Sequence, residues 1–100
     1  MNLLIPVDCN KRHEALLTTL DSSNDWAFVE LEEGQISNCT FYKDRNDIDC
    51  WVETVVVINE QEYVWQFIEE NIMVLVAPTQ RSIDEVVEAY LFRELHDLNV

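Results

Sequence analysis

The sequence predicts a small single-domain α/β protein, spanning residues 1–100, with a five-stranded mixed sheet. The length suits one domain, and 48% hydrophobic residues can supply one modest core. In the first half, two apolar segments flank the chain's single glycine, which is typical of a hairpin. In the second half, β-branched runs alternate with helical stripes, which is typical of parallel β-α-β units. The expected order is an N-terminal strand, a short helix, a hairpin, and then strand, helix, strand and helix.

The N-terminal part of the chain predicts a buried strand and a short helix. Residues 3–7 (Leu-Leu-Ile-Pro-Val) form a continuous apolar run that ends at a polar turn. Pro6 lacks a backbone N–H, so it must lie at a gap in the hydrogen-bond ladder. Residues 11–20 carry four apolar side chains at spacings that favour a short helix.

The next segment predicts an antiparallel hairpin. Strands are expected over residues 26–32 and 35–42, joined at Glu33-Gly34, where a tight turn needs positive φ. A two-residue loop would set three cross-strand pairs: Leu31 with Ile36, Phe28 with Cys39, and Trp26 with Phe41.

The second half predicts one polar connection and a β-α-β-α unit. Residues 43–53 are polar, and residues 54–58 (Thr-Val-Val-Val-Ile) are typical of a strand covered on both faces. A helical stripe over 61–70 is followed by Asn71, which suits the left-handed position after a helix. A second buried strand over 72–77 stops at a proline, and a capping box at Ser82-Ile83-Asp84-Glu85 opens a last helix whose stripe continues to Leu98.

The charge excludes several classes of partner. Twenty Asp and Glu against six Lys and Arg give a formal net charge of -14, which is unsuited to binding nucleic acid or anionic membranes. No apolar run reaches the roughly 18 residues of a membrane span. The N-terminus has no basic region before Asp8, so no signal peptide and a cytoplasmic location are expected. Three cysteines without a CxxC pattern are then expected to be free thiols.

Three segments resemble one known family. They are the opening Leu-Ile-Pro-Val-Asp, the hairpin Trp-Ala-Phe-Val-Glu-Leu-Glu-Glu-Gly-Gln-Ile, and the closing Ser-Ile-Asp-Glu-Val-Val-Glu-Ala-Tyr-Leu. Together with the order of elements, they resemble the dinitrogenase iron–molybdenum cofactor biosynthesis family over nearly the whole chain. The resemblance implies a ribonuclease-H-like fold and a non-enzymatic role in binding or carrying iron–sulfur-based cofactor precursors for nitrogenase.

The chain departs from that family where its ligand residues are expected. The family's His-Phe-Gly-Arg-like segment is replaced here by Leu20-Asp21-Ser22-Ser23. The family's glycine-rich turn is replaced by Asn59-Glu60-Gln61-Glu62, whose carboxylates repel an anionic ligand. An iron–sulfur-type cluster is therefore disfavoured, and the cofactor-binding residues are expected to be largely lost.

A ligand in an open α/β sheet sits outside the carboxyl ends of the parallel strands. The candidate cofactor-binding residues at that edge are Cys9, Asn10, Asn59, Thr79 and Arg81. Cys9 with His13 could begin an iron site, although metal sites usually need three or four ligands. The alternative is a partly buried thiol beside a surface histidine. We expect no catalytic residues, because no nucleophile is paired with a base in any known pattern.

Four aromatic residues are candidates for an interface: Trp26, Phe28, Phe41 and Trp51. Without a helix in the 43–53 connection, one sheet face would lose part of its cover, and residues 11–20, Trp65 or another subunit could supply it. Two functions remain open beside the weaker idea of a nucleic-acid mimic. One is a small non-enzymatic binding or accessory protein, and the other is an acidic module that dimerises or docks a protein partner.

Overall fold

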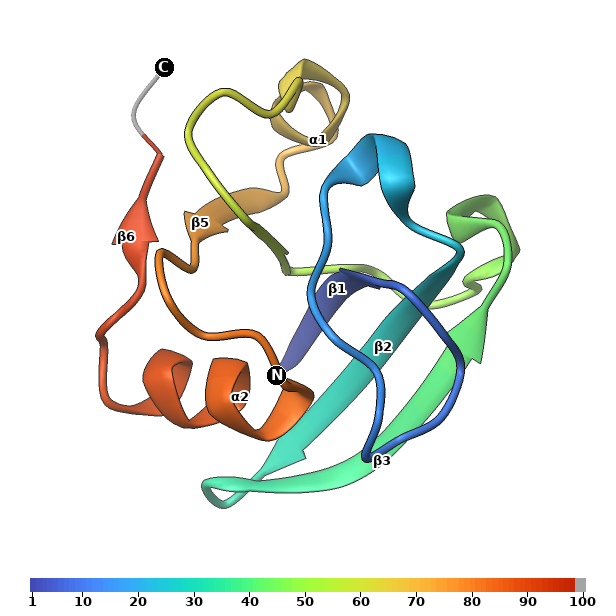
Figure 1. Cartoon of the computed structure of the whole chain (residues 1–100), viewed down its shortest axis with the longest axis vertical. Coiled ribbons are helices and arrows are strands. Elements are labelled where there is room, and N and C mark those ends of the chain that lie inside the picture. The colour runs from blue at the N-terminus through green and yellow to red at the C-terminus, as the bar shows by residue number, and fades with distance from the viewer. Residues whose placement is uncertain (99–100) are drawn as a thin grey trace.

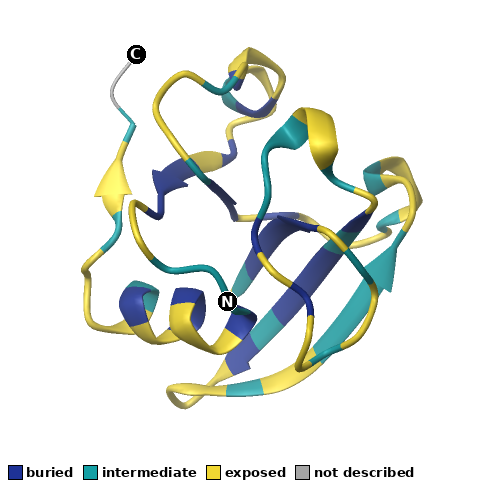
Figure 2. Ribbon diagram, in the orientation of Figure 1, coloured by how far each residue is buried: buried dark blue, intermediate teal, exposed yellow. Residues whose placement is uncertain are grey.

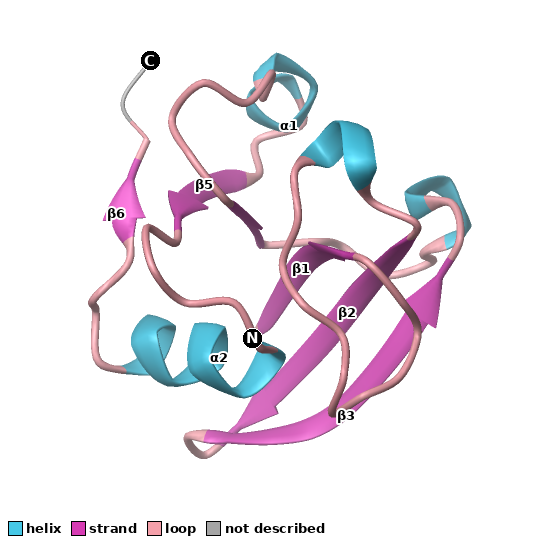
Figure 3. Cartoon of the chain, in the orientation of Figure 1, coloured by secondary structure: helices cyan, strands magenta, loops and turns pink. Residues whose placement is uncertain are grey.

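The structure is a computed structural model, and it describes residues 1–98 (Figure 1). Most of it is strand and loop, with two α-helices and two short 3₁₀ turns (Figure 3). The elements in chain order are β1 (Asn2–Val7), η1 (Leu20–Ser22), β2 (Asp25–Glu32), β3 (Gln35–Tyr42), η2 (Arg45–Asp47), β4 (Thr54–Val57), α1 (Trp65–Glu69), β5 (Met73–Val76), α2 (Ile83–Leu91) and β6 (His96–Asp97).

The strands form one mixed sheet in the order β3-β2-β1-β4-β5-β6. β4 is parallel to both β1 and β5, while the β1–β2, β2–β3 and β5–β6 pairs are antiparallel. This confirms the expected α/β class. The pairing of β1 with β4 extends only over Leu3 and Leu4, so Pro6 needs no N–H for that neighbour.

The sheet has a sixth strand because α2 ends earlier than its apolar stripe predicts. Arg93 takes a left-handed conformation (φ 59°). The N–H of Glu94 then donates to the carbonyl of Ala89 at 2.8 Å, which closes a Schellman motif. The chain turns back there, and β6 pairs His96 with Val76. The expected continuation of the helix to Leu98 is therefore wrong.

The hairpin turn lies at Glu33 (φ 52°) and Gly34 (φ 76°), as expected. Leu31 pairs with Ile36, which confirms the first predicted cross-strand pair. A β-bulge then leaves Ser37 unpaired, and its hydroxyl donates to the carbonyl of Glu30 at 3.1 Å. Every later pair shifts by one residue, which corrects the other two predicted pairs: Phe28 pairs with Thr40, Val29 with Cys39, Ala27 with Phe41, and Trp26 with Tyr42.

Two of the predicted helices differ from what the structure shows. Residues 11–20 are not helical, because Leu16 and Leu17 form isolated β-bridges with Ser82 and Val7. The helix predicted over 61–70 is reduced to five residues, and Asn71 ends it with a left-handed φ of 63°. The expected role of Asn71 as the residue after the helix is confirmed.

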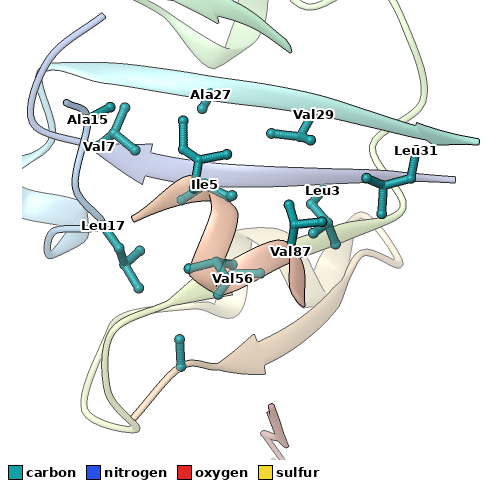
Figure 4. Close-up of a cluster of buried hydrophobic side chains, with 13 residues drawn as sticks. Leu3, Ile5, Val7, Ala15, Leu17, Ala27, Val29, Leu31, Val56 and Val87 are labelled. Atoms are coloured by element: carbon teal, nitrogen blue, oxygen red, sulfur yellow. The ribbon is translucent and has the colours of Figure 1, made fainter. Parts of the chain in front are cut away.

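The sheet separates two apolar cores. Its β1 strand is almost wholly buried (Figure 2). The α2-side core joins Leu3, Ile5 and Val29 of the sheet to the buried face of α2 and to Leu17 of the loop (Figure 4). The α1-side core lies on the other face and is centred on Phe28 and Phe67. The short connection after β3 therefore leaves neither face open, since Val52 and Ile48 of that connection pack on the α1 side.

Candidate functional site

The carboxyl edge of the parallel strands is where the sequence placed a ligand. β1 ends at Val7, β4 at Val57 and β5 at Val76, so this edge carries the loops that start at residues 8, 58 and 77. The structure brings all five candidate residues to these loops, but it does not gather them around one cleft.

The segment 16–18 crosses this edge and closes part of it. The N–H of Leu17 donates to the carbonyl of Arg81 at 2.7 Å, and the N–H of Thr18 donates to the carbonyl of Pro6 at 3.0 Å. Because these bonds tie the segment to the end of β1 and to the start of α2, the chain itself separates the Cys9 loop from the Arg81 loop. The sequence did not indicate this, since residues 11–20 read as a helix.

Arg81 and Thr79 are engaged within their own loop. The guanidinium of Arg81 donates to the carbonyls of Gln80 at 2.7 Å and Ala77 at 3.3 Å. Thr79 is exposed, and its N–H donates to the side chain of Gln80 at 3.4 Å. The cation expected to meet an anionic ligand therefore stabilises the loop after β5.

Cys9 is half-buried against the α2-side core, and Asn10 is exposed. The side chain of His13 lies 3.9 Å from a carboxylate oxygen of Asp84, which also pairs with Arg12. Within residues 1–98, no three His, Cys, Asp or Glu side chains gather as a metal site would require. Cys9 and His13 therefore have no third ligand in the described part of the chain.

Asn59, the remaining candidate, lines a cavity of about 440 Å³ on the α1 side of the sheet. The walls come from the segment around η1 and the loop that leads into α1. The lining residues are Thr19, Leu20, Asp21, Trp26, Asn59, Gln61, Glu62, Tyr63 and Gln66. The carboxylate of Glu62 accepts from the N–H of Leu20 at 3.2 Å, which joins the two walls. Sequence reasoning missed most of these residues because this contact spans 42 positions.

The four interface candidates do not share one surface. Trp26 and Phe28 belong to the α1-side core, whereas Phe41 packs on the α2 side. Phe28 is 2% exposed, which corrects its assignment to an exposed aromatic face. Trp51 alone is strongly exposed, at 64%. Phe67 of α1 meets Trp26 edge-on with ring centroids 6.3 Å apart, so α1 covers this face.

Trp51 lies at the amino edge of the sheet, where two other exposed apolar residues are also found. Asn2 donates its side-chain amide to the carbonyl of Trp51 at 2.8 Å, and the N–H of Met73 donates to the carbonyl of Glu53 at 3.0 Å. These bonds place Met1, Trp51 and Met73 at the same edge, where they are 67%, 64% and 56% exposed. Trp51 lines a hollow with Glu70 and Ile72 on the α1 side, whereas Met73 lines one with Tyr90 on the α2 side, so the two side chains do not form one surface.

Arg45 of η2 holds α1 in place from outside. Its guanidinium pairs with the carboxylate of Glu70 and lies over the ring of Phe67, 4.8 Å from the centroid. The hydrogen bond from Arg45 lowers the pKa of the Glu70 carboxyl below its usual value. Arg45 also donates to the side chain of Gln66, which lines the cavity, but its charge is paired with Glu70.

All three cysteines are free thiols, as expected, and they differ in exposure. Burial raises the pKa of the Cys39 thiol, which favours its protonated form. Cys50 is exposed. No helix among residues 1–98 is long and apolar enough to cross a membrane.

Comparisons with known proteins support the fold. No family model matches the sequence, and no curated protein matches it significantly. The crystal structure of PH0822 is similar with a TM-score of 0.74 and 15% identity, over 97% of this chain and 96% of that chain. The MJ0327 protein of Methanocaldococcus jannaschii, described provisionally as a dinitrogenase, is similar with a TM-score of 0.74 and 10% identity, over 99% of this chain and 95% of that chain. The chain therefore has the α/β fold of these two structures.

Proposed function

We propose that the protein is a small, non-enzymatic binding or accessory protein of the cytoplasm, built on a dinitrogenase-like fold that no longer holds an iron–sulfur-based cofactor. The observation that carries this proposal is the partly closed carboxyl edge. Segment 16–18 separates Cys9 from Arg81, and the guanidinium of Arg81 donates to loop carbonyls. The nearby opening is lined by the carboxylates of Asp21 and Glu62, which disfavour an anionic cluster.

Anaerobic reconstitution with iron and sulfide tests this proposal. We expect no cluster absorbance in the visible region and no stoichiometric iron by metal analysis, while circular dichroism verifies the fold. Cys9→Ala should behave as wild type, and Cys50→Ala is the matched control with an exposed thiol. Stoichiometric cluster absorbance that disappears in Cys9→Ala and persists in Cys50→Ala would overturn the proposal.

A second function, an acidic module that self-associates, is favoured by Trp51 at the amino edge. An aromatic side chain that is 64% exposed is typical of interfaces. The formal net charge of -14 opposes the approach of two copies, so salt should strengthen an apolar contact between them.

Light scattering at low and high salt tests the second function. We expect the dimer fraction of the wild type to rise with salt and to fall in Trp51→Ala. Trp65→Ala is the control, because Trp65 is 50% exposed but lies on α1 and not at the amino edge of the sheet. A monomer under both conditions, or an equal loss in both variants, contradicts self-association through this edge.

A further inference from the structure

The cavity between η1 and the loop before α1 plays no part in the proposed function, although its lining has a distinct chemical character. Its volume of about 440 Å³ is in the range of small-molecule sites. Trp26 at its side is half-buried and is held by Phe67, so this wall is fixed by the core. Tyr63, 73% exposed, also lines the cavity.

The charges of the lining are all negative. Asp21 and Glu62 contribute two carboxylates, and no Lys, Arg or His is among the described residues that line the cavity. Arg45 bonds the side chain of Gln66 at 3.3 Å, but its charge is paired with Glu70. One backbone N–H accompanies Glu62, which orients this carboxylate without cancelling its charge.

The two carboxylates and the two aromatic side chains of the lining favour an organic cation over a bare metal ion. A bare divalent cation prefers six or more oxygen ligands, and no group of three or more metal-binding side chains is found within residues 1–98. Aromatic rings next to carboxylates favour a weakly hydrated organic cation, because the ring faces attract positive charge while the carboxylates supply the ion pair. Asn59, Gln61 and Gln66 add amide groups that can orient polar atoms of the ligand.

We propose that this cavity binds an organic cation, an ammonium or guanidinium group on a short apolar stem, between Trp26 and Tyr63 and against the carboxylates of Asp21 and Glu62. The inference rests on the proposed function only in that both describe a binding protein. The group can come from a free amine or from the side chain of a partner protein, and the chemistry recognised is the same. A cluster that forms on reconstitution would overturn the proposed function, and a lack of cation binding would overturn this inference, so the two failures are distinguishable.

Trp26 fluorescence provides the assay. In the Trp51→Phe/Trp65→Phe background, Trp26 is the only tryptophan, and both replaced residues are exposed. We expect choline or agmatine, or a short arginine peptide with uncharged neighbours, to change the emission saturably at millimolar concentration. Saturation by the free amines assigns a small-molecule ligand, and saturation by the peptide alone assigns a partner side chain. The neutral isostere 3,3-dimethylbutanol should have no effect.

Matched variants test the position of the charge. Asp21→Asn and Glu62→Gln should each weaken binding about fivefold, a loss typical of one partly exposed ion pair. Gln at position 62 keeps an oxygen for the N–H of Leu20, and Asp21 is exposed, so both variants should fold. Glu88→Gln removes the same charge from an exposed position on α2 and should leave binding unchanged. Equal losses in all three variants, an equal response to the neutral isostere, or no saturable change up to about 10 mM would overturn the proposal.

Discussion

Replacing Phe67 tests how this small domain holds its shortest helix. α1 has only five residues, which is far below the length at which an isolated helix is stable in water. Its stability must come from docking, and Phe67 is its only buried residue, at 0% exposure. The ring lies edge-on to Trp26 and under the guanidinium of Arg45.

The expected loss is a large part of the total stability. Truncation of a fully buried Phe to Ala costs about 3–5 kcal/mol, since it removes apolar contact and leaves a cavity. Native domains are stable by about 5–15 kcal/mol, so Phe67→Ala should lose roughly a fifth or more of the free energy of unfolding. Phe67→Leu should lose less, and it remains measurable where the Ala variant is unfolded.

Urea unfolding followed by far-ultraviolet circular dichroism measures these differences. Trp65→Ala on the same helix is the control, because Trp65 is half exposed and its truncation should cost below about 1 kcal/mol. In the background without Trp51 and Trp65, the emission of Trp26 should also shift to the red in Phe67→Leu. If Phe67→Ala and Trp65→Ala have equal free energies of unfolding, the docking of α1 described above is refuted.

Three further predictions follow from local features. Glu85 accepts a hydrogen bond from the N–H of Ser82, which lowers the pKa of the Glu85 carboxyl. This hydrogen bond therefore stabilises the fold fully above the ordinary carboxyl pKa of about 4.3. The stabilisation is lost as the pH falls through the lowered pKa. In thermal melts, Glu85→Gln should therefore be less stable than wild type at pH 7, and the gap should close in acid; a gap independent of pH contradicts the capping role. Gly34→Ala should lower the free energy of unfolding, measured by chemical denaturation, by about 1 kcal/mol. The cost comes from the φ of 76° alone, because an added Cβ meets nothing within 4 Å. An unchanged free energy of unfolding would argue against this turn. Iodoacetamide should alkylate Cys50 well before Cys39 by mass spectrometry, because burial raises the pKa of the Cys39 thiol; the reverse order would contradict the packing of β3.

Local patterns predicted much of the architecture because the interactions behind them are local. The Ser82 capping box, the left-handed Asn71 and the turn at Gly34 each depend on a few neighbouring residues, and all three are present. The β-branched run that begins at Thr54 forms a strand buried in the sheet, as its composition predicts.

The prediction failed where the backbone found partners far along the chain. Residues 11–20 have a helical spacing, but the N–H groups of Leu17 and Thr18 bond the carbonyls of Arg81 and Pro6, which no local pattern reveals. The bulge at Ser37 moved Phe28 and Phe41 relative to the predicted pairs, since one extra residue reverses the faces of a strand. The early end of α2 at Arg93 created β6 from residues with a helical stripe.

The candidate site, like the fold, has some features that the sequence predicts and others that only the folded chain reveals. Composition and strand ends, which are local properties, predict the α/β class, the acidic charge and the arrival of Cys9, Asn59 and Arg81 at one edge. Long-range contacts, which no local pattern reveals, bring segment 16–18 across part of this edge and place Asp21 and Glu62 around a cavity with Trp26. Contacts such as that between Leu20 and Glu62 join residues 42 positions apart, and only the folded chain brings them together.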